Sequence, residues 1–275
     1  MGYALRFDGS TPCDLAEIST IGDGEASHSK GDEELDRLIK EIGELQSLLY
    51  AANTDALLIV LQGMDTSGKD GVIRKVLDEV DAQGVHVWPF KVPTAEEASH
   101  DFLWRHQLRT PATSMLAVFN RSYYEAVLVE RVKGIVSEEV VETRYPHIND
   151  FELLLTQSRT IVLKFFLYIS KEEQADRLLA RQVDAEKSWK LSLGDWQERQ
   201  SWDEYIDAYQ RAINATATPY APWYVVPSDR KWYRNLAVAQ VIAETLESHK
   251  ERWIAALHER GDHELAILRA AGYAT

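Results

Sequence analysis

The chain has few cysteines and no long apolar run. Its 275 residues include one cysteine, Cys13, which excludes an internal disulfide and any zinc site built from several cysteines. The longest apolar run, at 161–169, is interrupted by Lys164 and is far shorter than the about 20 residues that span a bilayer. The first 14 residues carry an early acidic residue and lack the apolar core of a signal peptide. We therefore expect a cytoplasmic protein that neither crosses a membrane nor is secreted.

Several catalytic and binding patterns are also missing. The eight histidines include no H-E-x-x-H pair or other spacing typical of a zinc hydrolase, so His147 is interpreted as a structural residue. No segment resembles the nucleophile elbow of a serine hydrolase. No basic stripe interleaved with aromatic residues is present, so we expect no nucleic-acid partner.

The formal net charge is −14 at pH 7, which at long range would repel a polyanion. Half of this charge comes from the first 50 residues, which hold 11 acidic and 4 basic residues. Basic residues gather around the motifs described below. Because exposed charges more than about 8 Å apart are largely screened at physiological salt, such local clusters decide ligand binding.

Apolar runs and helical spacings alternate along the chain. Strands are predicted at 56–61, 85–90, 114–120, 160–169 and 223–226, with helices at 32–52, after the first strand, from 94, and at 121–133, 173–182 and 235–260. This alternation predicts an α/β fold in three layers, with a five-stranded parallel sheet flanked by helices on both faces. We divide the chain into an irregular N-terminal arm (1–30), one domain (31–260) with a lid at about 171–215, and a C-terminal tail (261–275).

The most specific motif is the loop at 63–70, GMDTSGKD, between the first strand and a helical pattern. It fits G-x-x-x-x-G-K, in which Gly63 and Gly68 let backbone N–H groups close around phosphate oxygens while Lys69 adds a mobile positive charge. An ordinary glycine-rich turn is the alternative. The preceding strand, both glycines and the lysine together favour a P-loop kinase-like phosphate site.

Two residues depart from this motif. Asp70 replaces the Ser or Thr that usually ligates Mg²⁺, and Asp65 places a carboxylate inside a loop meant for anions. Repulsion between Asp65 and phosphate is costly unless a cation lies between them. Asp65 is therefore a candidate ligand of Mg²⁺ or Mn²⁺.

The third predicted strand ends in Asn120 and Arg121, where a Walker B strand has a carboxylate that organises Mg²⁺. Asn120 can orient a metal-bound water or a phosphate oxygen but brings no charge, so Asp65 and Glu125 or Glu130 must carry the metal's charge. The Arg121 guanidinium matches phosphate oxygens, with a surface ion pair as the alternative. Because ligands bind at the carboxyl ends of parallel strands, one crevice should receive Asp65, Lys69, Lys91, Asn120, Arg121, Asp229, Arg230 and Lys231.

A basic segment follows the fourth predicted strand. Arg177 and Arg181 are one helical turn apart, and Lys187 and Lys190 flank Trp189. In a P-loop kinase such a segment forms a lid that closes over phosphates and excludes water. The alternative is a solvated helix face.

Five segments together resemble the second family of polyphosphate kinases. They are GMDTSGKDG at 63–71, FNRS at 119–122, RYPHI at 144–148, KSWK at 187–190 and YAPWY at 220–224, and the similarity extends over about residues 30–250. The resemblance implies a P-loop kinase-like core with a helical lid. It also implies Mg²⁺-dependent transfer of the terminal phosphoryl group between inorganic polyphosphate and nucleotides.

The resemblance also implies site residues. Asp65 matches the family's loop aspartate, Lys69 its phosphate-binding lysine, and Asn120 and Arg121 its second motif; these four are the expected catalytic residues. Asp65 and Glu130, where other members carry a glutamate, are the expected metal ligands. The expected substrate-binding residues are Gly63, Thr66, Ser67, Gly68, Asp70, Arg74, Lys91, Arg131, Lys133, Arg144, Arg177, Arg181, Lys187 and Lys190.

Asn120 bears on the acceptor. Many members have Asp at this position, whereas the subgroup that uses both nucleoside mono- and diphosphates resembles this chain in having Asn. That subgroup usually reads His-Tyr-Glu-Asp where this chain has Tyr-Tyr-Glu-Ala at 123–126, so one carboxylate is absent at Ala126. We expect conversion of ADP or GDP to ATP or GTP and, more slowly, of AMP to ADP.

Two other functions stay open at this point. One is an ATP-using P-loop kinase of a small metabolite, and the other is a non-catalytic protein that binds polyphosphate. The expected partners are inorganic polyphosphate, purine nucleotides and further copies of the chain in a homodimer or homotetramer.

Overall fold

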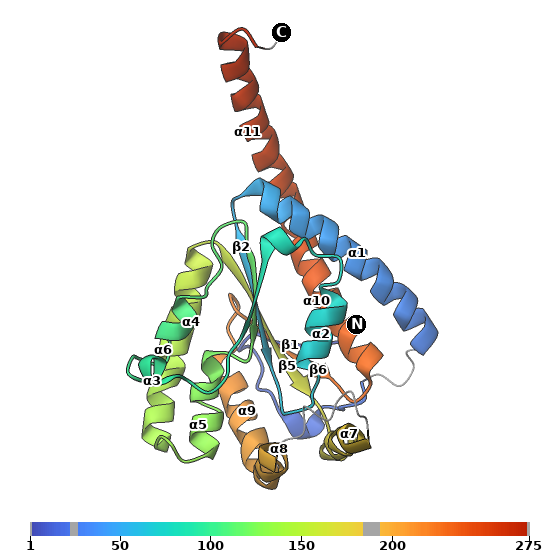
Figure 1. The fold of residues 1–275 in the computed structure, drawn as a ribbon, viewed down its shortest axis with the longest axis vertical. Coiled ribbons are helices and arrows are strands. Elements are labelled where there is room, and N and C mark those ends of the chain that lie inside the picture. The colour runs from blue at the N-terminus through green and yellow to red at the C-terminus, as the bar shows by residue number, and fades with distance from the viewer. Residues whose placement is uncertain (1, 23–26, 184–192, 274–275) are drawn as a thin grey trace.

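The computed structural model describes residues 2–22, 27–183 and 193–273 of the chain. They form three layers, with a sheet between two groups of helices, as predicted (Figure 1). Across these residues, no helix is both long enough and apolar enough to cross a membrane.

The sheet has six strands in the order β1-β6-β5-β2-β4-β3. They are β1 (Leu5–Phe7), β2 (Ala56–Gln62), β3 (Val85–Pro89), β4 (Leu116–Asn120), β5 (Thr160–Tyr168) and β6 (Trp223–Pro227). The five strands β2 to β6 are those predicted, and their pairings are parallel.

The prediction of a purely parallel five-stranded sheet is wrong at one edge. The N-terminal arm adds β1, which pairs antiparallel with β6, Leu5 lying opposite Val225. This strand has three residues, of which Leu5 and Arg6 are exposed. It therefore lacks the apolar run that marks a buried strand in a sequence.

One face of the sheet is covered by α1 (His28–Ala52), α2 (Lys69–Val76), α10 (Lys231–Glu247) and the start of α11 (Lys250–Ala270) (Figure 1). In β2, Leu57, Ile59 and Leu61 belong to the core under these helices, whereas Leu58 and Val60 belong to the core of the other face. The central strand is thus buried on both sides, as its continuous apolar run requires.

The other face is covered chiefly by α6 (Glu138–Gln157) and α9 (Trp202–Thr216). Shorter helices are α3 (Ala95–Ala98), α4 (Trp104–Gln107), α5 (Val129–Val132), α7 (Lys171–Val183) and α8 (Leu193–Glu198), with 3-10 turns at Leu15–Glu17, Ala82–Gly84, Tyr123–Ala126 and Arg199–Ser201. The capping box predicted at Thr94 and Glu97 is present and begins α3.

The helix predictions differ from the structure in several places. The single helix expected at 235–260 is α10 and α11, separated at Ser248 and His249, and the one expected at 121–133 is a 3-10 turn followed by α5. Helix α6 was not predicted. It contains Pro146, which a sequence pattern indicates as the end of a helix because proline lacks the N–H donor.

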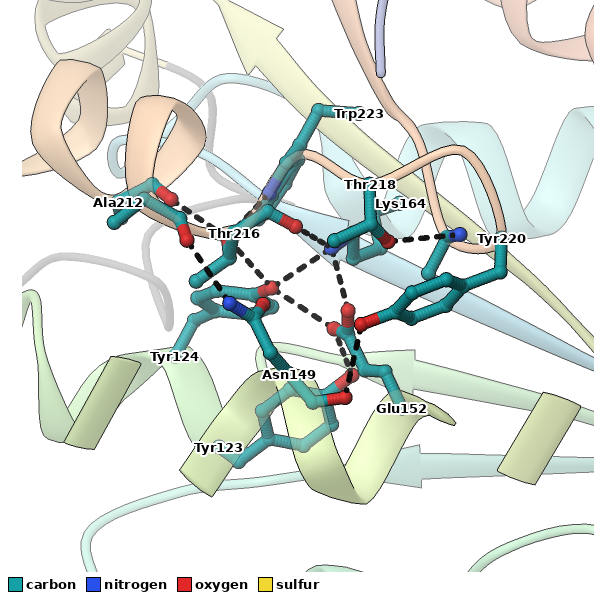
Figure 2. A network of polar contacts seen from close by, with 12 residues as sticks. Tyr123, Tyr124, Asn149, Glu152, Lys164, Ala212, Thr216, Thr218, Tyr220 and Trp223 are labelled. Atoms are coloured by element: carbon teal, nitrogen blue, oxygen red, sulfur yellow. Dashed lines mark hydrogen bonds and ion pairs between the residues drawn. The ribbon is translucent and has the colours of Figure 1, made fainter. Parts of the chain in front are cut away.

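A buried polar network ties four segments together behind the carboxyl end of β4 (Figure 2). Lys164 of β5 forms a 2.6 Å ion pair with Glu152 of α6, and both side chains are fully buried. Its ammonium also donates to the hydroxyl of Tyr124 and to the carbonyl oxygen of Thr216, the last residue of α9. The hydroxyls of Tyr123 and Tyr124 donate to the same Glu152 oxygen. The network therefore fixes the turn that follows the second motif against α6 and α9.

Candidate active site

The loop between β2 and α2 has the geometry of a phosphate cradle. Gly68 has φ +105°, and a Cβ added there would lie 1.8 Å from Nη1 of Arg234, so only glycine fits without displacing that guanidinium. Gly68 precedes the first residue of α2, and the N-terminus of a helix carries free N–H donors and a positive dipole end. The loop thus directs backbone donors at an incoming anion.

Lys69 is folded back onto its own loop. Its ammonium donates to the carbonyl oxygens of Gly63 at 2.6 Å and Met64 at 3.3 Å, and 8% of the residue is exposed. Burial, with the nearby charge of Arg121, lowers the pKa of Lys69 to about 8. A phosphate group at the loop would add negative charge close to this buried ammonium and favour its charged form.

Two hydroxyls of the loop are buried without a hydrogen-bond partner among the described residues, Thr66 Oγ1 and Ser67 Oγ. Thr66 also has a left-handed backbone, with φ +66°. Buried polar groups left unpaired cost about 1–3 kcal/mol each, and such costs are found where a ligand supplies the partner. Both hydroxyls belong to the expected substrate-binding set.

Asp65 and Arg121 meet across the carboxyl ends of β2 and β4. Arg121 donates to Asp65 at 2.6 Å and to Glu125 at 3.3 Å. Burial opposes ionisation of Asp65, but the charges of Lys69 and Arg121 outweigh it and hold the pKa of this carboxyl below its usual value. Arg121 is therefore oriented by two carboxylates, and Asp65 is ionised.

Glu198 of α8 lies beside Asp65, and both residues line the same small cavity. Burial and the neighbouring Asp65 raise the pKa of Glu198, so Glu198 is the member of this pair that holds a proton more readily. The two carboxyls, with Arg121 and Glu125, line a small cavity of about 20 Å³, room for one water or one ion.

The metal prediction can be compared with this donor set. Within the described part of the chain, no three His, Cys, Asp or Glu side chains lie close enough to form a complete metal site. Phosphate-bound Mg²⁺ needs one or two carboxylates, because substrate oxygens and water supply its other ligands. Asp65, paired with a second carboxyl at Glu198, fits that requirement. Glu130 lies elsewhere, ion-paired with Arg144 at 2.8 Å.

Asn120 ends β4 at the cleft and donates to Asp70 Oδ1 at 2.8 Å. Asp70 replaces the usual loop Ser or Thr, and Asn120 replaces the usual strand carboxylate. These two departures from the common motif therefore form one hydrogen-bonded pair, which links the first turn of α2 to β4.

A cleft of about 650 Å³ opens over the loop at the carboxyl ends of the strands. Eight cationic residues and two carboxylates, Asp65 and Asp70, line it; the cations are Lys69, Arg74, Lys91, Arg121, Arg177, Arg181, Lys231 and Arg234. A strongly positive cleft therefore lies over the phosphate loop of an acidic chain. Of the residues expected at the substrate, the cleft brings together Thr66, Gly68, Lys69, Asp70, Arg74, Lys91, Asn120, Arg121, Arg177 and Arg181.

Arg177 has a second role that the sequence did not indicate. Its guanidinium donates to the carbonyl oxygens of Thr66 and Ser67 in the loop and to those of Ser228 and Asp229 after β6, at 2.7–3.2 Å. It therefore joins α7 to the phosphate loop and to the end of a neighbouring strand.

Other expected residues lie away from the cleft. Arg131 pairs with Glu138 and Asp207, Lys133 pairs with Glu198, and Arg144 pairs with Glu130. Lys187 and Lys190 lie outside the described residues. These arginines and Lys133 thus connect helices of the second face around the small cavity and the lid.

Sequence reasoning missed Arg234 and Glu198. Arg234 is 3% exposed, donates to the carbonyl oxygen of Ser67, and has a pKa lowered to about 10 by burial and by the charge of Arg177. Its position one helical turn after Arg230, behind the last strand, is the signal that could have indicated it. Glu198 has no such local signal.

The cleft can hold a chain of phosphates. Its donors are the loop N–H groups, the Thr66 hydroxyl, and ammonium and guanidinium groups that match phosphate oxygens. No proton needs to be removed by a specialised base, because phosphoryl transfer depends chiefly on positioning and charge.

Comparisons with known proteins agree with this chemistry. The family described as Polyphosphate kinase 2 (PPK2) matches residues 25–253. A relative from Meiothermus ruber named AMP/ADP-polyphosphate phosphotransferase is 49% identical over 210 residues, 76% of this chain and 79% of the relative. The ADP-polyphosphate phosphotransferase of Rhodopseudomonas palustris is 46% identical over 224 residues, 77% of this chain and 78% of the relative. The crystal structure of Polyphosphate Kinase 2 from Arthrobacter aurescens TC1 aligns with a TM-score of 0.84 at 42% identity, covering 89% of this chain and 92% of that chain.

Proposed function

The chain belongs to the polyphosphate kinase 2 family, and from this membership we propose that its cleft transfers phosphoryl groups between inorganic polyphosphate and nucleotides. The observation that carries the proposal is the lining of eight cations around the phosphate loop, in a chain with a formal charge of −14. Binding a single small anion would not need eight cations, whereas binding two phosphate chains that meet end to end would.

In the proposed reaction a terminal oxygen of the nucleotide attacks the terminal phosphorus of polyphosphate. The new P–O bond lengthens the nucleotide by one phosphate, the bridging P–O bond breaks, and the polyphosphate leaves one unit shorter. Lys69 and the loop N–H groups hold the oxygens of one phosphate group. Arg121, oriented by Asp65 and Glu125, lies where it can stabilise charge on the transferred group.

Mg²⁺, or Mn²⁺, is part of the proposal. Asp65 would hold it, with Glu198 as the second carboxyl in place of Glu130, and bound there the metal would neutralise charge on the reacting phosphates. The proximity of the two carboxyls supports this assignment, because a divalent cation between them would offset their mutual repulsion. Lys69 and Arg121 also line the large cleft, where they can bind phosphate oxygens.

We propose that both AMP and ADP are acceptors, with ADP or GDP faster. A monophosphate is one phosphate shorter, so it must slide toward the donor or be bridged by a further cation to reach it. Asn120 donates to Asp70 and adds no charge to the cleft, whereas Ala126 lacks a carboxyl that could anchor a second metal. The names of the relatives from M. ruber and R. palustris include both kinds of acceptor.

The experiment is a product assay with purified protein, Mg²⁺, long-chain polyphosphate and AMP, ADP, GMP or GDP supplied separately. We expect ATP from ADP, GTP from GDP, and slower conversion of AMP. Lys69→Ala should lower every rate at least about 100-fold, since a charged clamp in a dry site is worth a few kcal/mol. Lys75→Ala, an exposed lysine of the same helix, is the matched control and should be unchanged.

Polyphosphate binding with no nucleotide product would refute the enzymatic proposal. Product from ADP but none from AMP at millimolar concentration would refute the dual acceptor alone. A cytoplasmic location and assembly into a homodimer or homotetramer are further proposals. The single, buried Cys13 supports the location.

A further inference from the structure

The last helix, α11, leaves the domain and extends beyond it (Figure 1). Trp253 near its start is buried, and Arg260 donates to the carbonyl oxygen of Ala51 at the end of α1. Every residue at 261–273 is exposed. The family match covers residues 25–253, so the projecting part lies outside it.

The projecting part of α11 needs another surface to pack against. Isolated helices shorter than about 12–15 residues are marginal in water, because packing of an apolar face supplies most helix stability. Leu265, Ile267 and Leu268 are 36%, 49% and 44% exposed on the projecting turns, and Ile254 is 37% exposed nearer the domain. These apolar side chains are what another surface could bury.

The apolar residues form a stripe. Because each residue turns the helix by about 100°, Ile254, Leu257, Leu265 and Leu268 all lie within about 40° of a line drawn through Gly261. A Cβ added at Gly261 would meet nothing within 4 Å, so the centre of the stripe is open. Only Leu257 is partly packed against the domain.

The stripe is symmetric about Gly261 in a way that fits a second copy of itself. Leu257 and Leu265 lie four residues before and after Gly261, and Ile254 and Leu268 lie seven residues before and after it. In an antiparallel pair centred on Gly261, Leu257 of each copy meets Leu265 of the other, and Ile254 meets Leu268. The two glycines lie at the axis, where the absence of side chains lets the backbones approach.

The charges are complementary in the same arrangement. In an antiparallel pair, residues on one flank of a helix face the same flank of the other copy. Arg260 then lies about 3 Å along the axis from Glu264 of the second copy, and His258 lies at the same offset from Asp262, since the rise is about 1.5 Å per residue. Symmetry forms each pair twice, and no like charges meet on either flank among these four residues.

We propose that two copies of this chain associate through α11, antiparallel about Gly261. The overlap is about 15 residues, or about 22 Å, which is smaller than standard protein interfaces, so the association is reversible in the micromolar range. The contact does not depend on the proposed activity, because α11 projects from the end of the molecule opposite α7 and α8 (Figure 1).

The test is a charge-swap mixture of the full-length chain, followed by sedimentation equilibrium up to about 200 µM. In Arg260→Glu, carboxylates would oppose Glu264 twice; in Glu264→Arg, cations would oppose Arg260 twice. Each variant alone should associate about tenfold more weakly than the natural chain. Mixed together they pair opposite charges at both positions, so association should return.

The mixture separates the interface from any effect within one chain, since mixing changes nothing inside either variant. Glu259→Arg, which points away from the stripe, is the matched control and should associate normally. Leu268→Asp should weaken association whatever the flanking charges. Circular dichroism and phosphoryl transfer per chain should stay unchanged in every variant, and a loss of activity without a change in association would concern the cleft instead.

Three outcomes would overturn the proposal. They are a natural chain that stays monomeric throughout, single variants that associate as tightly as the natural chain, and a mixture no tighter than either variant alone.

Discussion

Lys164→Met tests the buried network behind the second motif. The change keeps an unbranched side chain but removes an ammonium that donates to Glu152 at 2.6 Å, to Thr216 at 2.8 Å and to Tyr124 at 3.0 Å. Burial already holds the pKa of Lys164 below its usual value, although Glu152 opposes this. Methionine leaves Glu152 in place, fully buried and without the cation.

The expected loss in the free energy of unfolding follows from the protonation of the Glu152 carboxyl in the variant. This carboxyl keeps the two tyrosine hydroxyls on Oε1 and loses the ammonium on Oε2. An unpaired buried carboxylate takes up a proton rather than stay charged. Since glutamate ordinarily titrates near 4.3, this uptake costs about 4 kcal/mol at pH 7.5 and about 2 kcal/mol at pH 5.5. The free energy of unfolding should fall by these amounts.

The assay is urea denaturation at both pH values. The folded variant holds a proton on this carboxyl, whereas the unfolded chain releases it above the ordinary pKa of glutamate. The deficit in the free energy of unfolding therefore grows as pH rises from about 4. The double variant Lys164→Met with Glu152→Gln removes both charges. It should recover most of the lost free energy of unfolding, and its remaining deficit should not change with pH. A deficit below about 1 kcal/mol, or one equal at both pH values, would refute the reasoning.

Three further outcomes are expected at the cleft. The value of kcat/KM should fall as pH rises through about 8, because burial lowers the pKa of Lys69 to that value and the neutral amine no longer attracts phosphate; a flat profile up to pH 9.5 would contradict this. Asp65→Asn should lower the rate more than Asn120→Ala and should change its Mg²⁺ dependence, and an unchanged metal titration would count against Asp65 as a ligand. Gly68→Ala should cost about 2–4 kcal/mol in urea denaturation, from its left-handed backbone and the displaced guanidinium of Arg234, and an unchanged midpoint would show that the loop relaxes freely.

The sequence indicated what is local. Strand β2, the loop and α2 follow one another without a gap, so the apolar run, two glycines and the lysine specify the cradle within about 20 residues. The alternation of strands and helices then implied which strand ends share one edge, which brought Asn120 and Arg121 to Asp65.

What the sequence did not indicate depends on distant partners. β1 exists because Leu5 pairs with Val225, and nothing near Leu5 specifies that partner. Arg177 was interpreted as a phosphate ligand, but the carbonyl oxygens that it binds come from segments about 50 and 110 residues away. Likewise, Glu198 lies near Asp65 only because the fold brings α8 to the small cavity beside the loop.

The anchoring of α7 determines where the segment that we predict to be a lid could pivot. Gln174 donates to the carbonyl oxygen of Asp65, Arg177 holds four carbonyl oxygens, and Leu178 is buried. Swinging the first half of α7 would break several charge-assisted hydrogen bonds at once, so this half moves with the phosphate loop as one rigid body. Any closing motion must therefore begin beyond Leu178. A displacement of the loop by bound phosphate would be transmitted directly to the first half of α7.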